Sequence, residues 1–410
     1  GHVTGVQTCA LPIYSCALVG NGTAKCWGAN ASGQLGNNST VNALLPVAVS
    51  GLGVDGRALT ISAGDSHTCV VLVGGTARCW GGNQDGQLGN NSLTMSKVPV
   101  TVSGLAGAIA IAAGGAHTCA LLANSTVKCW GLNASGQLGN GTRTSSKTPV
   151  LVSDLTGAIA IAAGGGHSCA VIVSGAVKCW GNNALGEVGN STTTDALLPV
   201  AVTGLGNATG IAAGQVHTCA VLANGTAKCW GSNAAGQLGN LAAVPGSSSP
   251  VLVSSIGAVT AVAAGAGHSC ALLANGTAKC WGAGSVGQLG RGSATGSGTP
   301  VAVSGLTFAT ALALGGDHSC TFIASGSAKC WGSGSAGELG NGSTTNSTSP
   351  VGVVGFSAGT KATVISVSTY FSCATLANGT AKCWGYNGFG NLGNGTDRKS
   401  TRLNSSHVAL

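Results

Sequence analysis

The cysteines are the residues whose spacing most clearly predicts chemistry in this 410-residue chain. Between residues 14 and 396 they form eight pairs, and the two members of each pair are ten residues apart. The pairs are Cys16 and Cys26, Cys69 and Cys79, Cys119 and Cys129, Cys169 and Cys179, Cys219 and Cys229, Cys270 and Cys280, Cys320 and Cys330, and Cys373 and Cys383. A hairpin centred on Asn124 sets Cys119 directly opposite Cys129, and opposed Cα atoms of an antiparallel pair lie about 4.5 or 5.5 Å apart, within reach of a disulfide. The spacing therefore predicts eight structural disulfides and an oxidising compartment.

Two other uses of the cysteines stay open. His117 and Cys119 lie two residues apart on one strand face opposite Cys129, so the three could converge on Zn²⁺. In the first and last repeats Tyr14 and Phe371 take the His position while both cysteines remain, so the pair does not need the His. We therefore prefer disulfides and expect no metal. Reduced cysteines, buried as small apolar groups, are the alternative for a reducing compartment.

The acidic residues give no pattern of a catalytic site. No two of them have the spacing of an acid/base pair, and they are scattered among the repeats. They are Asp55, Asp65, Asp85, Asp154, Glu187, Asp195, Asp317 and Glu338. The chain also lacks a nucleophile elbow with partners and a phosphate-binding Gly-Lys-Ser/Thr loop. We therefore expect a protein without catalytic residues or cofactor.

Three further residue types recur at fixed positions of the repeat, the His in six repeats and the other two in all eight, and we interpret each as structural. The His residues are expected to form hydrogen bonds, the Trp residues to pack between repeats, and the Lys or Arg before each second Cys to pack its stem while its charge reaches water. They are His67, His117, His167, His217, His268 and His318; Trp27, Trp80, Trp130, Trp180, Trp230, Trp281, Trp331 and Trp384; and Lys25, Arg78, Lys128, Lys178, Lys228, Lys279, Lys329 and Lys382. The functional alternatives are a sugar-binding aromatic surface and a basic ring for nucleic acid. Residues 14–396 hold fourteen basic and eight acidic residues, too mild an excess for a dedicated nucleic-acid binder, so no nucleic acid is expected.

The elements that position these residues repeat every 50 to 53 positions. In one unit, residues 99–102, 108–112, 117–122 and 127–130 read as four short strands, with Gly-rich turns between them. Four apolar strands per unit predict the blade of a propeller, covered by neighbours on both faces. Seven complete units start near residues 46, 99, 149, 199, 250, 300 and 350, after a partial unit at 14–45. The sequence thus predicts an all-β, seven-bladed β-propeller, with eight blades or an open fragment of a longer array as alternatives.

The two ends of the chain are related through their coding DNA. Read in opposite directions, residues 1 to 13 and 409 to 397 can be encoded by complementary codons, and the match stops at Tyr14 and Thr396. We therefore expect residues 1–13 and 397–410 to be non-native, adapter-like segments, and residues 14–396 to be the biological insert, a metagenomic fragment of a longer gene. Removing them leaves Cys9 outside the paired set.

The repeated motifs resemble a known family. The series Ala-Ala-Gly, His-(Ser/Thr)-Cys-Ala, Lys-Cys-Trp-Gly and Gly-Gln-Leu-Gly-Asn, as at residues 112–140, is similar to the repeat of the regulator of chromosome condensation (RCC1) family. The resemblance covers residues 14–396 and points to its bacterial, Cys-rich branch. It implies a seven-bladed propeller and, from the family's eukaryotic founder, nucleotide exchange on a small GTPase.

Our functional prediction is a non-enzymatic scaffold, secreted to the cell envelope or the extracellular space, that binds a protein or a surface polymer. We expect a monomer with no transmembrane segment, and we expect the partner at the most variable loops, 52–57, 240–248, 291–298 and 356–361. Exchange activity is one alternative, but it needs an inserted wedge, and the nearly constant unit length leaves no room for one. A secreted enzyme inhibitor is the other.

Overall fold

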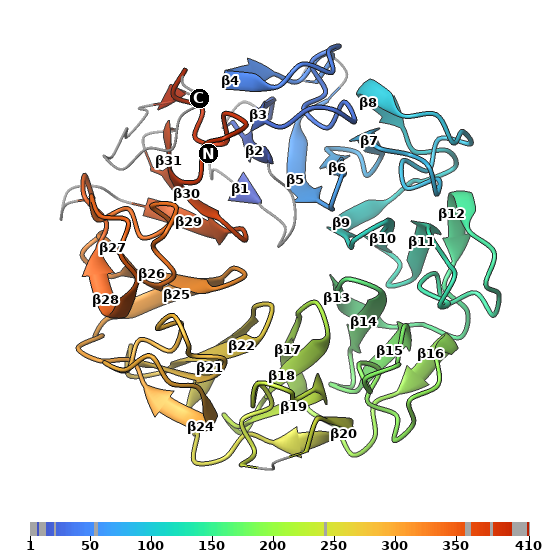
Figure 1. Cartoon of the computed structure of the whole chain (residues 1–410). Coiled ribbons are helices and arrows are strands. Elements are labelled where there is room, and N and C mark those ends of the chain that lie inside the picture. Colours follow the sequence, from blue (N-terminus) through green and yellow to red (C-terminus); the bar gives the residue numbers. More distant parts are fainter. Residues whose placement is uncertain are drawn as a thin grey trace.

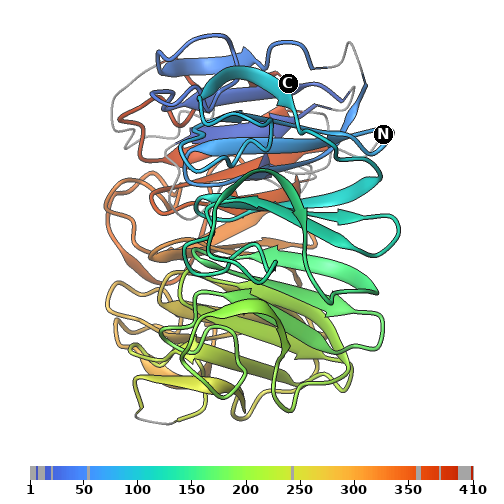
Figure 2. The ribbon, with the colours of Figure 1, turned by 90° about the vertical axis from the view of Figure 1, so that its right-hand side faces the viewer.

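The chain folds into a ring of β-sheets (Figure 1). The computed structural model describes residues 6–7, 14–19, 22–52, 56–241, 244–356, 362–377, 380–395 and 408–409. Within these residues every regular element is a strand, and the strands form eight antiparallel four-stranded sheets, each a blade. Figure 2 shows the ring from its side, with the strands of successive blades running roughly parallel to one another.

The prediction of seven blades is wrong, because the structure has eight four-stranded sheets. Each blade is built around one Cys-containing hairpin, and there are eight hairpins. The sequence count began each unit at the strand that ends the preceding blade, so residues 14–45 looked like a remnant. In the structure these residues supply the hairpin of blade 1, and the two-residue strands β1 and β32 complete the first and last sheets.

The strands follow the same order in each blade. The first strands, which lie nearest the ring centre, are β1 (Val6–Gln7), β5 (Ala58–Ala63), β9 (Ala108–Ala113), β13 (Ala158–Ala163), β17 (Ala208–Ala213), β21 (Val259–Ala264), β25 (Ala309–Leu314) and β29 (Ala362–Val367). The second strands are β2 (Tyr14–Leu18), β6 (His67–Leu72), β10 (His117–Leu122), β14 (His167–Ile172), β18 (His217–Leu222), β22 (His268–Leu273), β26 (His318–Ile323) and β30 (Phe371–Leu376).

The third and fourth strands lie progressively farther from the centre. The third strands are β3 (Ala24–Gly28), β7 (Ala77–Gly81), β11 (Val127–Gly131), β15 (Val177–Gly181), β19 (Ala227–Ser232), β23 (Ala278–Gly282), β27 (Ala328–Gly332) and β31 (Thr380–Gly385). The fourth strands are β4 (Ala43–Ala48), β8 (Ser96–Thr101), β12 (Ser146–Leu151), β16 (Ala196–Ala201), β20 (Gly246–Leu252), β24 (Ser297–Ala302), β28 (Ser347–Gly352) and β32 (Val408–Ala409).

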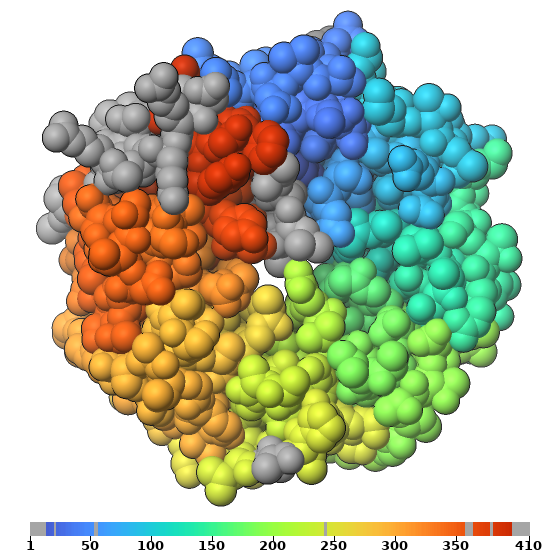
Figure 3. All heavy atoms as spheres, in the orientation of Figure 1, coloured from blue at the N-terminus to red at the C-terminus, as the bar shows by residue number. Residues whose placement is uncertain are grey.

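The two middle strands of a blade form its core. Every residue of β10 is buried, on both faces of the sheet, because the neighbouring blades cover both. This explains why these strands are apolar or small at successive positions and do not alternate with polar residues. The first strands are rich in Ala, and the blades close around a narrow central opening (Figure 3).

The loops leave the ring on two opposite faces, because successive strands run in opposite directions. We call one the motif face: it carries the turns between first and second strands, such as 64–66, and the Gly-Gln-Leu-Gly loops, such as 82–95. We call the other the crossover face: it carries the hairpin loops, such as 73–75, and the crossovers to the next blade, such as 102–107.

A tryptophan joins each of blades 1 to 7 to the blade before it, whereas the indole N–H of Trp384 in blade 8 is buried without a hydrogen-bond partner. The indole N–H of Trp130 in blade 3 donates a 2.9 Å hydrogen bond to the backbone carbonyl of Gln87 in blade 2. Equivalent bonds of 2.8–2.9 Å join Trp80 to Gln34, Trp180 to Gln137, Trp230 to Glu187, Trp281 to Gln237 and Trp331 to Gln288. Trp27 donates to the carbonyl of Asn391 at 2.8 Å, which closes the ring between blades 1 and 8. All these indoles are fully buried, so they pack between repeats as expected and are not exposed for stacking against a sugar.

The last glycine of each Gly-Gln-Leu-Gly motif makes room for the tryptophan of the next blade. Gly139 has a φ of +63°, and a Cβ there would lie 2.9 Å from Cδ1 of Trp180. Gly36 and Gly89 stand in the same relation to Trp80 and Trp130. The glycine is therefore required by a close approach between blades as well as by the turn.

Gly139→Ala and Gly104→Ala separate these two requirements, because both glycines have the same φ but nothing lies within 4 Å of a Cβ at Gly104. We expect Gly104→Ala to lower the free energy of unfolding by about 1 kcal/mol, the cost of a left-handed L-residue. Gly139→Ala should cost about 1–3 kcal/mol more, because the new methyl group overpacks the indole. Urea unfolding of both variants measures the difference, and equal losses would contradict the role of the joint.

Candidate binding site

Each cysteine pair lies in register across the middle hairpin of its blade. Cys119 and Cys129 are direct partners in the ladder, with Cα atoms 4.1 Å apart, and a disulfide joins them. All eight pairs have this arrangement, with Cα separations of 4.0–4.1 Å. Each bond closes a short loop and contributes about 2–3 kcal/mol by restricting the unfolded chain.

The recurring histidines form a second set of joints between blades. Nε2 of His117 lies 2.8 Å from the hydroxyl of Ser168 in the next blade. The imidazole is therefore paired with that hydroxyl and not with the cysteines of its own hairpin. The same contact, at 2.8–2.9 Å, joins His67 to Thr118, His167 to Thr218, His217 to Ser269, His268 to Ser319 and His318 to Ser372. The Ser or Thr of the His-(Ser/Thr)-Cys motif is therefore the receiving half of a joint, a partner that the sequence analysis did not identify.

These contacts fix the protonation of the imidazoles. The Ser168 hydroxyl donates its hydrogen to the carbonyl of Gln137 at 3.2 Å, so it accepts a hydrogen from Nε2 of His117. Nδ1 of each of the six imidazoles is then an unprotonated nitrogen, buried and without a hydrogen-bond partner. Burial lowers the pKa of His67, His167 and His217 to about 4, and that of His117, His268 and His318 to about 3. All six are neutral at pH 7.

The first and last blades depart from this rule. The hydroxyl of Tyr14 donates to the carbonyl of His67 at 2.7 Å and lies 3.0 Å from the hydroxyl of Thr68. Phe371 has no polar atom for Ser15 in blade 1, whose hydroxyl instead lies 3.6 Å from the sulfur of Cys373. Both aromatic residues fill the His position and keep the blade packed.

The repeated cations hold the crossovers in place. Nζ of Lys178 donates to the carbonyl of Asp154 at 2.7 Å, and Lys228 and Lys279 make the same bond to Gly204 and Ser255. These three lysines are half-buried, and their hydrogen bonds to the crossovers lie at the surface. This matches the interpretation of packed stems with solvated charges, and adds a specific acceptor for each.

The acidic residues cap turns. Oε2 of Glu187 accepts a hydrogen bond from the backbone N–H of Leu185, and Glu338 does the same for Ala336. Oδ1 of Asp317 accepts from the side-chain amide of Gln288. Burial raises the pKa of Asp65 and of Glu187, but Asp65 lies in blade 2 and Glu187 in blade 4. In the described part of the chain, no three His, Cys, Asp or Glu side chains gather in a way that could hold a metal.

An asparagine organises the long loop of the motif face in most blades. The side-chain amide of Asn133 donates to Oδ1 of Asn140 and to the carbonyls of Thr142 and Thr144, while its oxygen accepts from the N–H of Leu138. Asn30, Asn83 and Asn183 do the same. Blades 6 and 7 have Gly284 and Gly334 at this position. The loop architecture therefore changes in the second half of the ring.

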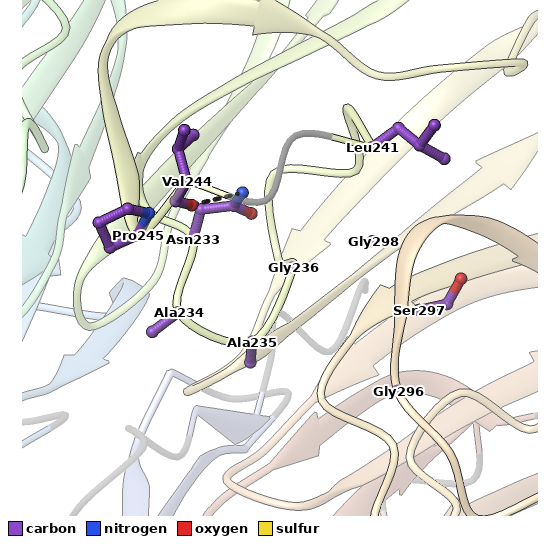
Figure 4. Close-up of a pocket in the computed structure, with 10 residues that line it drawn as sticks. All are labelled: Asn233, Ala234, Ala235, Gly236, Leu241, Val244, Pro245, Gly296, Ser297 and Gly298. Carbon is purple, nitrogen blue, oxygen red and sulfur yellow. Dashed lines mark hydrogen bonds between the residues drawn. The ribbon is translucent and has the colours of Figure 1, made fainter.

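A pocket of about 630 Å³ lies where the change begins, between the long loops of blades 5 and 6 (Figure 4). Its lining comes from Asn233, Ala234, Ala235, Gly236, Leu241, Val244, Pro245, Gly296, Ser297 and Gly298. A second pocket of about 270 Å³, toward blade 4, shares Pro245. Two of the four loops predicted to meet a partner, 240–248 and 291–298, are thus brought together here. In the other two, residues 53–55 and 357–361 lie outside the described residues, as do 242–243.

Leu241 is the unusual residue of this pocket. It has a φ of +63°, and its side chain is 75% exposed. Its backbone N–H donates to the carbonyl of Gly298 in the next blade. Asn38 of blade 1 and Asn91 of blade 2 make the equivalent bonds, to the carbonyls of Lys97 and Lys147. Asn adopts the left-handed region more readily than Leu, so Leu241 carries backbone strain of about 1–2 kcal/mol while its apolar side chain is exposed.

Comparisons with known proteins define the class of this propeller. The RCC1-like domain family matches residues 103–409, and the regulator of chromosome condensation (RCC1) repeat matches residues 21–71 and 75–121. The chain belongs to the RCC1 repeat family, as its motifs predicted.

Several curated proteins share part of the sequence. The human E3 ubiquitin-protein ligase HERC2 is 34% identical over 95 residues, which are 23% of this chain and 2% of the ligase. The Arabidopsis thaliana RCC1 domain-containing protein RUG3, mitochondrial, is 34% identical over 94 residues, or 23% of this chain and 21% of that protein. The matches thus span only 2–25% of the length of this chain or of the matched protein, so the activity of those whole proteins is not assigned to this chain.

Solved structures show the same fold. Human WBSCR16 superimposes with a TM-score of 0.70 at 22% identity, covering 84% of this chain and 96% of that one. Yeast RCC1 (Prp20), solved with Kap60 bound, gives 0.69 at 20% identity and covers 94% of both chains. At this level of identity the likeness shows the fold alone. No helix of the described residues is long and apolar enough to cross a membrane.

Thiol counting tests the disulfides directly. Protein unfolded without reductant should expose one reactive thiol per chain, that of Cys9, because the other sixteen cysteines are paired. Reduction should raise the count to seventeen. Cys9→Ser is the control and should expose none before reduction. Seventeen thiols in the unreduced protein would show that the pairs do not form.

The buried histidines predict loss of stability in acid. Their pKa values are depressed on folding, so the unfolded chain binds more protons below pH 6.5, and stability present above pH 6.5 is lost as the pH falls toward 4 and 3. The melting temperature should fall steeply over this window in calorimetry. His167→Tyr, which copies blade 1, should flatten the fall because it removes one titrating group. An unchanged slope in that variant would contradict the assignment to the histidines.

Proposed function

We propose that this RCC1-repeat propeller is a non-enzymatic binding scaffold of the cell envelope or extracellular space, which holds a partner protein or surface polymer at the pocket between blades 5 and 6. The observation that carries the proposal is Leu241, a strained and exposed apolar residue at the junction of two irregular loops. Strain kept at a position where the other blades use Asn, Ser or Gly is accounted for by binding.

The construction of the ring supports a scaffold. Each blade is held by a disulfide, by a tryptophan joint in most cases and by a histidine joint in six, so the loops of the motif face are carried on a rigid frame. Functional residues typically lie on loops that such a frame positions. Eight disulfides also support an oxidising compartment. Among structural relatives, yeast Prp20 was studied for its binding to Gsp1p and histones, which is a precedent for protein recognition by this fold.

The chemistry of the pocket is that of a contact surface. Leu241, Val244 and Pro245 supply apolar area, while backbone groups of the glycine-rich segment 296–298 border it. A partner that buries the Leu241 side chain would gain about 1.5–3 kcal/mol, which corresponds to roughly 10- to 100-fold in affinity.

Leu241→Asn tests the proposal, because it installs the residue that blades 1 and 2 carry at the same φ. We expect it to raise the free energy of unfolding by about 1 kcal/mol and to weaken partner binding by tenfold or more. Binding is measured by quantitative affinity capture from cell-envelope and culture fractions with the wild-type and variant chains immobilised. Asn91→Leu is the control: it should cost stability and leave binding unchanged.

Equal capture by wild-type and Leu241→Asn chains would overturn the pocket as the binding site. Two assays run beside it address the two alternatives, nucleotide exchange on a small GTPase and inhibition of a secreted enzyme. Stimulated nucleotide release would contradict a non-enzymatic scaffold, and inhibition lost in Leu241→Asn would identify the partner as an enzyme.

A further inference from the structure

The charges of the propeller are divided unequally between its two faces. Among the described residues, nine cationic side chains lie on the crossover face with one carboxylate, that of Asp154. The nine are Lys25, Arg57, Arg78, Lys128, Lys178, Lys228, Lys279, Lys329 and Lys382. The motif face has four cations and six carboxylates: Lys97, Arg143, Lys147 and Arg291 with Asp65, Asp85, Glu187, Asp195, Asp317 and Glu338. One face is therefore strongly positive and the other slightly negative.

The positions of the cations are fixed by the fold. The side chains of Arg78, Lys128, Lys178, Lys228, Lys279 and Lys382 each donate to a crossover carbonyl, at 2.6–3.3 Å. The result is a circle of positive charge with about one cation per blade, at one level of the ring. Lys382 is the buried exception, over the ring of Phe356 at 5.3 Å.

Inside this circle, a β-bulge turns one residue of the first strand out of the ladder in blades 2 to 8. In β9 the register passes from Ala108 to Ala110 and skips Ile109, and Leu59 and Ile159 are the skipped residues of β5 and β13. Bulges re-aim side chains in this way. With the hairpin-loop residues Val73 and Val173, they form what we call the apolar arc, whose five side chains are 44–77% exposed across three adjacent blades.

The opposite half of the ring shows that a bulge does not require an apolar residue at this position. Blades 5, 6 and 7 have Thr209, Thr260 and Thr310 at the bulge position, and each hydroxyl donates to a backbone carbonyl of its own blade. The fold therefore accepts Thr where blades 2, 3 and 4 expose Leu or Ile.

The loops of the crossover face repeat the same contact from blade to blade. In blades 2 to 7 the first residue of the first strand donates to a hairpin carbonyl of the preceding blade at 2.8–3.0 Å, as Ala108 does to Gly75 and Ala158 to Ser125. Each of these hairpins is thereby tied to the following blade in the same way. Both pockets described above open among loops of the motif face.

We propose that the crossover face docks on an anionic phospholipid bilayer, with the ring of cations against the head groups and the apolar arc inserted among them. Exposed aliphatic side chains inside a circle of cations suit a lipid interface, because acyl chains accept separate apolar side chains while anionic head groups meet the cations. Cations near such a surface each contribute attraction to anionic lipid, and the effect is screened by salt. This surface is distinct from the pocket of the proposed function and does not depend on it.

Co-sedimentation of the full, oxidised chain with vesicles tests the proposal. We expect binding to phosphatidylcholine vesicles that contain 30% phosphatidylglycerol, little binding to pure phosphatidylcholine, and a steep loss of binding between 50 and 300 mM salt. Lys128→Gln/Lys178→Gln/Lys228→Gln keeps a donor for each crossover carbonyl and should weaken binding on the order of a hundredfold. The matched control on the motif face, Lys97→Gln/Lys147→Gln/Arg291→Gln, should bind like the wild type.

Ile109→Thr/Ile159→Thr tests the arc separately, since Thr occupies the same bulge in blades 5 to 7. It should reduce vesicle binding about tenfold and leave the melting temperature close to that of the wild type. Equal losses in the motif-face control, or no binding to anionic vesicles, would overturn the proposal. So would tight binding to soluble polyphosphate that Ile109→Thr/Ile159→Thr does not affect, because the ligand would then be an acidic polymer. Partner capture that depends on Leu241 would survive each of these outcomes, so the two proposals fail separately.

Discussion

The contacts between neighbouring blades depend on one backbone carbonyl oxygen at each junction. The carbonyl of Gln87 accepts both the indole N–H of Trp130 and the hydroxyl of Thr118, which come from two strands of the following blade. The same double acceptor recurs at Gln34, Gln137, Glu187, Gln237 and Gln288. Because only the backbone is used, the side chain is free to be Gln or Glu, and it turns back to cap its own loop. The position of each blade against the next is thus fixed by hydrogen bonds within the ring itself.

Much of this frame could be predicted from the sequence, because it is formed by residue types that recur at fixed spacing. The ten-residue interval sets Cys169 opposite Cys179, the Gly-rich turns mark the ends of strands, and the repeated Lys implies a packed stem. The number of blades could not be read in the same way. A period has no natural starting point, and beginning it at the outermost strand split the first blade into what looked like a remnant. Counting the hairpins, each of which forms the two middle strands of one sheet, would have given eight.

The binding site was only partly accessible to sequence reasoning, for a physical reason. Departures from the repeat marked loops 240–248 and 291–298, but their meeting in one pocket follows from the ring, which sets blade 5 beside blade 6. The strain at Leu241 follows from aligning it with Asn38 and Asn91, whose φ values only the structure supplies. The division of charge between the faces was hidden for a related reason: net charge sums over both faces, and the fold separates them.

The histidine joints give the ring a direction. Each imidazole of blades 2 to 7 donates forward to a hydroxyl of the next blade, and the hydroxyl donates back to a carbonyl of the blade it came from. The sequence of donors starts at Tyr14 and ends at Phe371, which has nothing to donate across to Ser15. The propeller is therefore a closed ring whose series of histidine joints is open, with a seam between blades 8 and 1 that relies on the Trp27 hydrogen bond and on packing. We expect transient opening of the ring, as measured by amide hydrogen exchange, to occur most easily along that seam, because no imidazole hydrogen bond has to break there.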